Sequence, residues 1–472
     1  MYPLLEYKNH LEKICLIKEG KLSLRDNVFF FLQRIKENKK LNAFNFIFED
    51  CLEQCDSIQR KIVDGSAGKL AGMVVAIKDV LAIKDKPLTC SSKILKDFTA
   101  IYTSTAVQKL IAEDAIIIGK TSCDEFAMGS SNENSAFGPV LNPHDNSRVP
   151  GGSSGGSAVA VAANLCDVAL GTDTGGSIRQ PAAFCGVYGL KPTYGRVSRY
   201  GLTAFASSFD SIGPFANSTD DAALVLEIIS GYDKKDSTSQ NTPVPSFSHN
   251  LSTDKKFKIG IPPECFGQGL NLEVKSAIEN EIEKLKSAGH EIVEIHLPHT
   301  DYTIATYYIL TTAEASSNLA RYDGAHYGFR SQNSSDLIGS YTDSRSEALG
   351  KEVQRRIMLG TYVLSAGYYD AYYRKAQKVR RLLKKDFDEA FEKVDVIITP
   401  TAPDVAFKIG EKSNDPLQMY LEDIYTTSAN LVGIPGINIP IGKNKDGMPI
   451  GMQAMANQFD ELTLLQFSTS LK

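Results

Sequence analysis

The amino-acid sequence predicts an α/β fold with one large domain, residues 70–472. Two observations indicate this class. The short apolar runs Met73–Ile77 and Ala115–Ile118 are partly β-branched, as buried strands require, and they flank a helix-like segment at 106–112. This arrangement predicts a β-α-β crossover. A second strand-helix-strand pattern spans 257–297, and no internal repeat of solenoid period is present.

The first 69 residues, 1–69, predict a helical segment that precedes this domain. Charged and apolar side chains alternate there at helical spacing, and no chemistry is visible. Phe29, Phe30, Leu32 and Ile35 form the stripe that we expect to be buried.

Further elements follow along the chain. The small, apolar segment 157–164 predicts a helix packed closely against a sheet, and the polar segment 232–256, with two prolines, predicts a long surface loop. A helix over 272–288 should end at a glycine. Helical patterns fill 346–393, and 394–399 is expected to be a strand.

The composition is that of an ordinary globular enzyme. The 472 residues are 42% hydrophobic and 23% charged. Fifty-one basic and 56 acidic side chains give a net charge of −5, which argues against unaided nucleic-acid binding. The basic run Lys378–Lys385 is best interpreted as the exposed face of a helix.

The cysteines indicate neither a metal site nor a disulfide framework. There are eight, with no CxxC, and no histidine lies near Cys51 and Cys55 to complete a zinc tetrad. We expect free thiols in a reducing compartment. No signal peptide is visible at the N-terminus, and no apolar run approaches the ~18 residues of a membrane span. A cytoplasmic location is therefore expected.

Two glycine-serine clusters and one lysine carry the chemistry. The clusters are 151–157 (GGSSGGS) and 171–179 (GTDTGGSIR), and the lysine lies in 74–80 (VVAIKDV). A Ser-His-Asp triad needs an imidazole beside the serine, yet His144 is the only histidine between residues 11 and 248. A lysine kept neutral by its surroundings can replace it, so the pattern favours Lys-Ser chemistry.

The first cluster admits three interpretations. A flexible linker is not normally flanked by well-patterned apolar segments. A phosphate loop would need a lysine where Ser157 stands. In an active-site loop, glycines would let the backbone approach a substrate closely. In the second cluster, backbone N–H groups could form an oxyanion hole beside the hydroxyl of Ser177. Alternatively, Ser177 caps a helix in a plain turn.

The run 151–181 resembles the amidase signature family, in register, with Ser153 and Ser177 24 residues apart (177 minus 153). This resemblance implies a large mixed central sheet covered by helices on both faces. It also implies a Lys–Ser–Ser triad that cleaves amides. Ser177 would be the acylated nucleophile, Ser153, after a cis peptide bond, would relay its proton, and Lys78 would be the terminal base. The implied oxyanion hole consists of the N–H groups of Thr174, Gly175 and Gly176.

Physical chemistry makes this arrangement coherent. A free lysine has a pKa near ~10.4, and a position at the end of a buried strand would lower the pKa of Lys78 by desolvation. Asp173 and Arg179 flank the proposed nucleophile and are expected to form a structural ion pair.

Four further segments, 124–129, 313–324, 352–360 and 419–433, resemble the A subunits of glutamyl-tRNA(Gln) amidotransferases, a branch of the same family. This resemblance implies that glutamine is hydrolysed here and that ammonia passes to a partner in a heterotrimer with B and C subunits. That partner would bind most of the misacylated Glu-tRNA(Gln) and use ATP and Mg²⁺ to amidate it. No cofactor or metal is expected in this chain, which lacks a phosphate loop.

The same resemblance assigns the glutamine head group to Arg356 and Asp423, and it places Tyr307 and Gly129 beside the substrate. Arginine suits bidentate recognition of a carboxylate. Arg355 is an alternative to its neighbour, and both charged residues could instead lie on exposed helix faces. A free-standing amidase acting on a small or acyl amide is the alternative function. A non-catalytic scaffold is disfavoured because all triad positions are intact.

Overall fold

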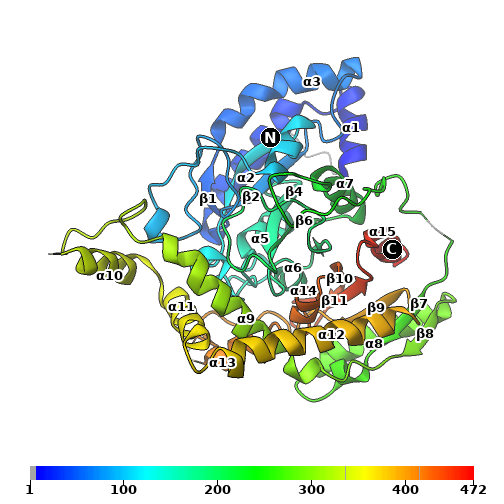
Figure 1. Ribbon diagram of the computed structural model, residues 1–472. Helices are drawn as coiled ribbons and strands as arrows, with labels where there is room; N and C mark the ends of the chain where they lie inside the picture. Colours follow the sequence, from blue (N-terminus) through cyan, green and yellow to red (C-terminus); the bar gives the residue numbers. More distant parts are fainter. Residues whose placement is uncertain (1–6, 253, 335, 414, 472) are drawn as a thin grey trace.

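A mixed sheet runs through the centre of the molecule (Figure 1). The computed structural model describes residues 7–252, 254–334, 336–413 and 415–471. The strand order is β1-β3-β2-β4-β6-β5-β10-β11-β9-β7-β8. The strands are β1 (Phe44–Ile47), β2 (Val74–Lys78), β3 (Ile116–Thr121), β4 (Val168–Asp173), β5 (Tyr188–Lys191), β6 (Ser211–Ala216), β7 (Lys258–Ile261), β8 (Glu291–Glu294), β9 (Val396–Pro400), β10 (Gly436–Lys443) and β11 (Pro449–Ala456).

Helices cover both faces of this sheet (Figure 1). The α-helices are α1 (His10–Lys18), α2 (Leu24–Glu37), α3 (Cys55–Asp64), α4 (Thr105–Ala112), α5 (Gly155–Ala162), α6 (Arg179–Cys185), α7 (Thr219–Ile229), α8 (Leu272–Ser287), α9 (Thr303–Asn318), α10 (Leu337–Ala348), α11 (Lys351–Leu364), α12 (Lys375–Phe391), α13 (Pro416–Leu421), α14 (Thr427–Val432) and α15 (Glu461–Thr469). This architecture confirms the predicted α/β class.

Both predicted crossovers are present. Strands β2 and β3 pair in parallel and are connected through α4, and β7 and β8 pair in parallel and are connected through α8. The helix α8 is followed by Gly289 at φ +90°, which is the expected stop. In the described part of 232–256 no helix or strand forms, in agreement with the predicted loop.

The N-terminal segment is mostly helical, but it also contributes a strand that the sequence analysis did not predict. β1 pairs antiparallel with β3 and forms one edge of the sheet. The predicted apolar stripe of α2 is wrong at Phe29, whose side chain is 51% exposed. The buried face instead contains Leu24, Val28 and Phe31, because three successive phenylalanines cannot all point to one side of a helix.

The alternation of side chains along β2 determines which face of the sheet carries the site. Val75 and Ile77 pack with α4 and α7 in one apolar cluster. Val74 and Ala76 pack with α2 and α5 in another cluster on the opposite face. Lys78, two residues further on, therefore points to the α5 side.

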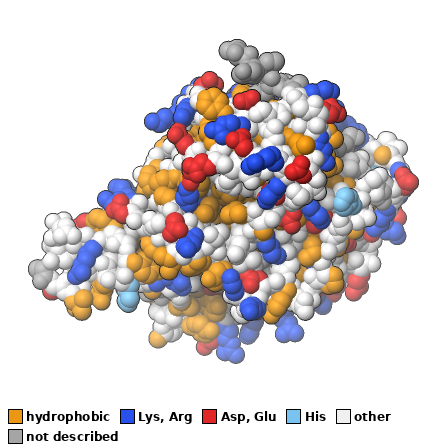
Figure 2. Space-filling model, turned by 90° about the horizontal axis from the view of Figure 1, so that it is seen from above, with side chains coloured by type: hydrophobic (Ala, Val, Ile, Leu, Met, Phe, Trp, Pro, Cys, Tyr) orange, Lys and Arg blue, Asp and Glu red, His pale blue; other side chains and the backbone are white. Residues whose placement is uncertain are grey.

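The helices and the charged side chains of the described residues bear on membrane contact and on surface charge. None of the helices in the described ranges is long and apolar enough to cross a bilayer. Figure 2 shows basic and acidic side chains interspersed over one face of the molecule. This mixture agrees with the small net charge of −5.

Candidate active site

The two glycine-serine clusters lie side by side at the sheet. The first cluster leads into α5, and the second joins β4 to α6. The N–H of Ser154 donates to the carbonyl of Ser177 at 3.3 Å, which joins the two loops directly. The peptide bond between Gly152 and Ser153 is cis, as the family resemblance implied.

Lys78 points from the end of β2 into this junction. Its Nζ donates to Oγ of Ser153 and Oγ of Ser154, both at 2.8 Å, and to Oγ1 of Thr172 at 2.9 Å. The lysine and Ser153 are fully buried. Burial lowers the pKa of Lys78 to about 8, because the surrounding hydroxyl groups do not replace the solvation that its charge would have in water.

The acceptors Ser154 and Thr172 were not among the predicted site residues. Ser154 also donates its hydroxyl proton to the carbonyl of Thr172 at 3.1 Å. It must therefore accept from Lys78 rather than donate to it. The sequence contained a weak signal for both residues, since each adjoins a predicted site residue or the expected ion pair.

Ser177 is the member of the predicted triad that reaches solvent, with 8% of the residue exposed. The alternative interpretation of Ser177 as a helix N-cap is wrong. Helix α6 begins at Arg179, and its N-cap residue is Ile178. The carboxylate of Asp173 accepts from the N–H groups of Gly176 and Ile178 instead, at 2.8 and 3.2 Å.

The predicted oxyanion residues form a tightly held turn. The N–H of Gly176 is engaged by Asp173, as described above, whereas no acceptor among the described residues receives the N–H of Thr174 or Gly175. The hydroxyl of Thr174 donates to Oδ1 of Asp210 at 2.6 Å. The carbonyl of Gly175 accepts from the Thr426 hydroxyl at 2.7 Å, which ties the turn to the segment before α14.

The expected ion pair behind the turn is confirmed. Arg179 contacts Asp173 through Nη2 to Oδ1 at 2.9 Å and Nε to Oδ2 at 3.1 Å, and both side chains are fully buried. Burial alone would raise the pKa of Asp173, but the guanidinium charge and hydrogen bonds hold it at about 2. Arg179 also donates to Asn430 at 2.7 Å and to Gln453, so the pair connects the turn to α14 and β11.

The two charged residues predicted to bind a head group are both buried, so the interpretation that places them on exposed faces is wrong. Arg356, on α11, has a side chain that is 3% exposed, and it pairs with Glu352 at 2.8 Å. The neighbouring Arg355 is 41% exposed. The guanidinium of Arg356 lies 5.3 Å from the ring centroid of Tyr308, and aromatic rings of two other segments also surround it.

Asp423 lies near Arg356 without pairing with it. Its Oδ2 accepts from Oγ of Ser130 at 2.5 Å, a contact that the sequence analysis missed. Burial raises the pKa of Asp423 to about 7, although Ser130 and the charge of Arg356 act to lower it. The two predicted head-group residues are therefore a cation and a carboxyl group that are held by different partners.

The two remaining predicted pocket residues lie against the loops of the triad. A methyl group added at Gly175 would lie 2.4 Å from the ring of Tyr307, so this tyrosine packs directly on the oxyanion turn. A methyl group added at Gly129 would lie 2.4 Å from Cγ of Asp124. Gly129 thus permits the close approach of a buried carboxylate.

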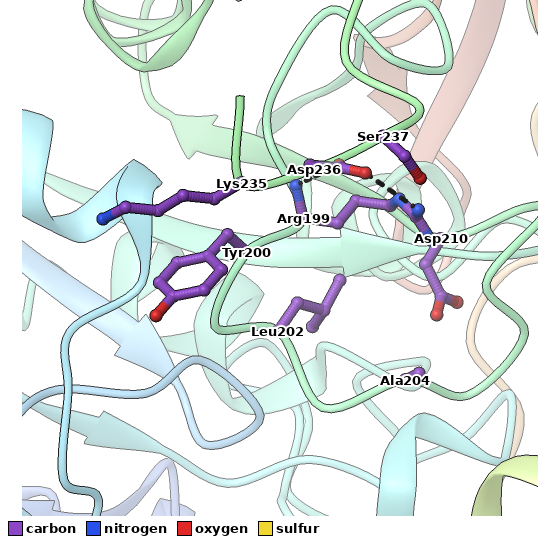
Figure 3. A pocket seen from close by; sticks show the side chains of 8 residues that line it. All are labelled: Arg199, Tyr200, Leu202, Ala204, Asp210, Lys235, Asp236 and Ser237. Atoms are coloured by element: carbon purple, nitrogen blue, oxygen red, sulfur yellow. Dashed lines mark hydrogen bonds and ion pairs between the residues drawn. The ribbon is translucent and has the colours of Figure 1, made fainter. Parts of the chain in front are cut away.

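A cavity of about 280 Å³ is lined in part by residues 199–204 and 235–237 (Figure 3). Asp210, the acceptor of Thr174, lines this cavity together with Arg199, which is paired with Asp236 at 3.1 Å. Burial raises the pKa of Asp210 to about 6. No group of three or more His, Cys, Asp or Glu side chains suitable for a metal ion occurs in the ranges that the structure describes.

The sequence of this chain is similar to those of known amidases. A sequence model of the amidase family matches residues 26–465. The chain is 57% identical to the A subunit of glutamyl-tRNA(Gln) amidotransferase from Koribacter versatilis, over 94% of this chain and 93% of that protein. It is 53% identical to the protein of the same name from Chlorobium phaeobacteroides, over 99% and 98%.

Two solved structures of similar fold belong to proteins with different names. The A subunit of glutamyl-tRNA(Gln) amidotransferase from Thermotoga maritima superposes with a TM-score of 0.78 at 39% identity, over 96% of this chain and 92% of that one. The peptide amidase from Stenotrophomonas maltophilia gives a TM-score of 0.81 at 28% identity, over 99% and 97%. The fold is thus shared between proteins whose names indicate different amide substrates.

Proposed function

The chain belongs to the amidase family, and we propose that it is the glutaminase subunit of a tRNA-dependent amidotransferase. One observation carries the catalytic part of the proposal: a desolvated lysine, Lys78, is hydrogen-bonded at 2.8 Å to the hydroxyl of Ser153, in a loop that contacts Ser177. The names of relatives at 53–57% identity support the choice of glutamine and of the assembly.

Neutral Lys78 fits its surroundings well. A neutral amine has two N–H groups and one lone pair, and three hydroxyl groups face it. The two N–H groups can donate to Ser154 and Thr172, because Ser154 already uses its own proton elsewhere. The lone pair then remains to accept the proton of Ser153.

The reaction follows from this arrangement. Oγ of Ser177 attacks the carboxamide carbon of glutamine, its proton passes to Oγ of Ser153, and the proton of Ser153 passes to Nζ of Lys78. When the C–N bond breaks, the leaving nitrogen takes a proton back along this path and departs as ammonia. Water then hydrolyses the glutamyl ester on Ser177, releases glutamate and restores the serine. The N–H groups of Thr174 and Gly175 would stabilise the oxyanion in both steps.

The pocket chemistry supports an amino-acid substrate. Free glutamine has an α-carboxylate and an α-ammonium group, which require a cation and an anion at a fixed separation. Arg356 and Asp423 supply these charges while each is held by another partner, Glu352 and Ser130 respectively. The exposed Arg355 is less suited to this role.

The ammonia would be used by a different chain of the assembly. We assign ATP, Mg²⁺ and most of the contact with misacylated Glu-tRNA(Gln) to the B and C subunits of a heterotrimer. The relatives carry the name of one lettered component of a larger enzyme, which supports an assembly of several chains.

Ser177→Ala in the assembled complex tests the whole proposal. We expect glutamine hydrolysis to be lost, while amidation of Glu-tRNA(Gln) with added ammonia persists, because that step occurs in the partner. Wild-type glutaminase activity in the variant would exclude Ser177 as the nucleophile. Loss of both activities in a folded, assembled variant would exclude the division of labour between the chains.

A further inference from the structure

Asp124 is a fully buried carboxylate that the chemistry described above does not use. It precedes the short turn after β3 and lies between two glycines of the site. A methyl group added at Gly152 would lie 2.1 Å from Oδ2 of Asp124, and one added at Gly129 would lie 2.4 Å from its Cγ. The carboxylate therefore packs directly against Gly152, the residue that precedes Ser153.

Backbone groups hold this carboxylate in one orientation. Oδ2 accepts from the N–H of Asn132 at 2.9 Å, and Oδ1 accepts from the N–H of Asn134 at 3.1 Å. The N–H of Asp124 itself donates to the carbonyl of Ser153 at 3.1 Å. Asp124 thus contacts both Gly152 and Ser153, the first through its side chain and the second through its backbone N–H.

The same carboxylate acts electrostatically on Lys78. Burial raises the pKa of Asp124 to about 6, while the two backbone donors and the charge of Lys78 act to lower it and Glu133 acts to raise it. Conversely, the pKa of Lys78, which burial lowers, is raised by the charges of Cys123, Asp124, Asp173 and Asp210, in that order of strength. At neutral pH, Asp124 therefore favours the protonated form of Lys78.

We propose that Asp124 is a positioning residue of the catalytic centre, which fixes the loop of Ser153 and, through its charge, limits the fraction of Lys78 that is free to accept a proton. The two roles have opposite effects on turnover. Positioning of the loop increases turnover, and the negative charge decreases it near neutral pH. This proposal rests on the assignment of Lys78 as the base under the proposed function.

A buried carboxylate of the same region provides a matched comparison. Asp79 is the next residue after Lys78 and is equally buried, but it is paired with Lys120 at 3.3 Å and accepts from Asn45 at 2.9 Å. Its charge is not among the four that act most strongly on the pKa of Lys78. Proximity in sequence therefore does not determine which carboxylate acts on the base.

The test is the pH profile of kcat for glutamine in Asp124→Asn, Asp124→Glu and Asp79→Asn, with thermal unfolding measured in parallel. For Asp124→Asn we expect kcat at its pH optimum to fall at least tenfold, because one N–H loses its acceptor. We also expect the rising limb of the pH profile, which we assign to Lys78, to move to lower pH by about 1 unit. A nearby opposite charge shifts a pKa by an amount of this size. Asp79→Asn should leave the limb in its wild-type position.

Asp124→Glu separates the two roles and serves if the asparagine variant does not fold. It retains the charge but is longer, so we expect a lower kcat and an unmoved limb. A limb that stays in place in Asp124→Asn, or that moves in Asp124→Glu, would overturn the electrostatic part. An unchanged kcat in either variant would overturn the positioning part. Ser177→Ala distinguishes these failures from failure of the proposed function, because an active Ser177→Ala enzyme would remove the premise itself.

Discussion

Nζ of Lys78 and Oγ of Ser153 are hydrogen-bonded at 2.8 Å, in a region where both side chains are inaccessible to solvent. The lysine has hydroxyl groups, not carboxylates, as its contacting acceptors. Desolvation therefore outweighs charge pairing at this position and brings the pKa of Lys78 to about 8.

This pKa predicts the pH dependence of turnover. Only neutral Lys78 can accept a proton, and the neutral fraction grows as pH rises through about 8. We expect kcat for glutamine to rise roughly tenfold per pH unit below that value and to level off above it. The measurement is kcat at saturating glutamine over a series of buffers. A profile that is flat, or that falls with rising pH in this range, would contradict the role of the lysine as base.

The identity of the base can be tested by substitution. Lys78→Arg should lose activity nearly as completely as Lys78→Ala, because guanidinium stays protonated and cannot accept the serine proton. Ser153→Ala should be severely impaired as well, since it interrupts the path between Lys78 and Ser177. Turnover numbers are compared after circular dichroism has verified folding. A Lys78→Arg enzyme that keeps most of its turnover would show that the lysine supplies only positive charge.

The pocket charges distinguish glutaminase from free-standing amidase. Arg356→Ala and Asp423→Ala should each lower kcat/KM for glutamine by more than tenfold, because losing one partner of a buried charged contact costs ~2–5 kcal/mol. An uncharged simple amide should be affected far less. Arg355→Ala is the matched control, since its side chain is exposed. Equal losses on both substrates would indicate that these residues maintain the fold, and would favour the free-standing amidase.

Much of the fold was predictable from local patterns, whereas the site depended on contacts distant in sequence. The buried strand β2 was predicted from its apolar, β-branched residues. The end of helix α8 at Gly289 was predicted from the preference of glycine for this position. The burial of α2 was misjudged at Phe29, because three consecutive phenylalanines cannot share one face of a helix, and the polar Asn27 lies on the buried face. Tertiary packing overrode hydrophobicity there.

The triad positions came from a family resemblance, and the structure brings Lys78 and Ser153 together as that resemblance implied. The hydrogen bonds from Arg179 to Asn430 and Gln453 could not have been found in the same way. They join residues about 250 positions or more apart, and no local pattern specifies such partners. Ser130 was missed for the same reason, because its acceptor, Asp423, lies on another segment.

The oxyanion turn requires glycine at position 176. Gly176 has φ +135°, and an added methyl group would lie 2.1 Å from Oγ1 of Thr426, the hydroxyl that holds the turn. We expect Gly176→Ala to reduce kcat at least a hundredfold, because the clash would displace the turn and with it the N–H groups of Thr174 and Gly175, and loss of one oxyanion donor costs about 10²–10³. Gly267→Ala is the control, because its nearest neighbour would lie at 4.0 Å. Wild-type kcat in Gly176→Ala would refute this account of the turn.

The buried ion pair of Asp173 and Arg179 predicts a large effect on stability. Arg179→Met should lower the free energy of unfolding by about 3–5 kcal/mol, because it leaves an unpaired carboxylate in the interior. Urea denaturation at pH 7 is the measurement. Arg374→Ala removes the solvent-exposed pair with Asp370 and should change the free energy of unfolding by less than about 1 kcal/mol. If both variants lost a similar amount of unfolding free energy, burial would not determine how much an ion pair contributes to stability.

The order of the strands also bears on how the chain is made. Strands β10 and β11 lie between β5 and β9, so within the described ranges they are the only ladder that joins the strands before residue 217 to those of 258–400. During synthesis, an emerging polypeptide that ends before residue 436 would hold two unjoined pieces of sheet. Lys78 would belong to one piece, and the segments carrying Arg356 and Asp423 would follow the other. We therefore expect a chain truncated before residue 436 to lack amide-cleaving activity, because its sheet would be incomplete.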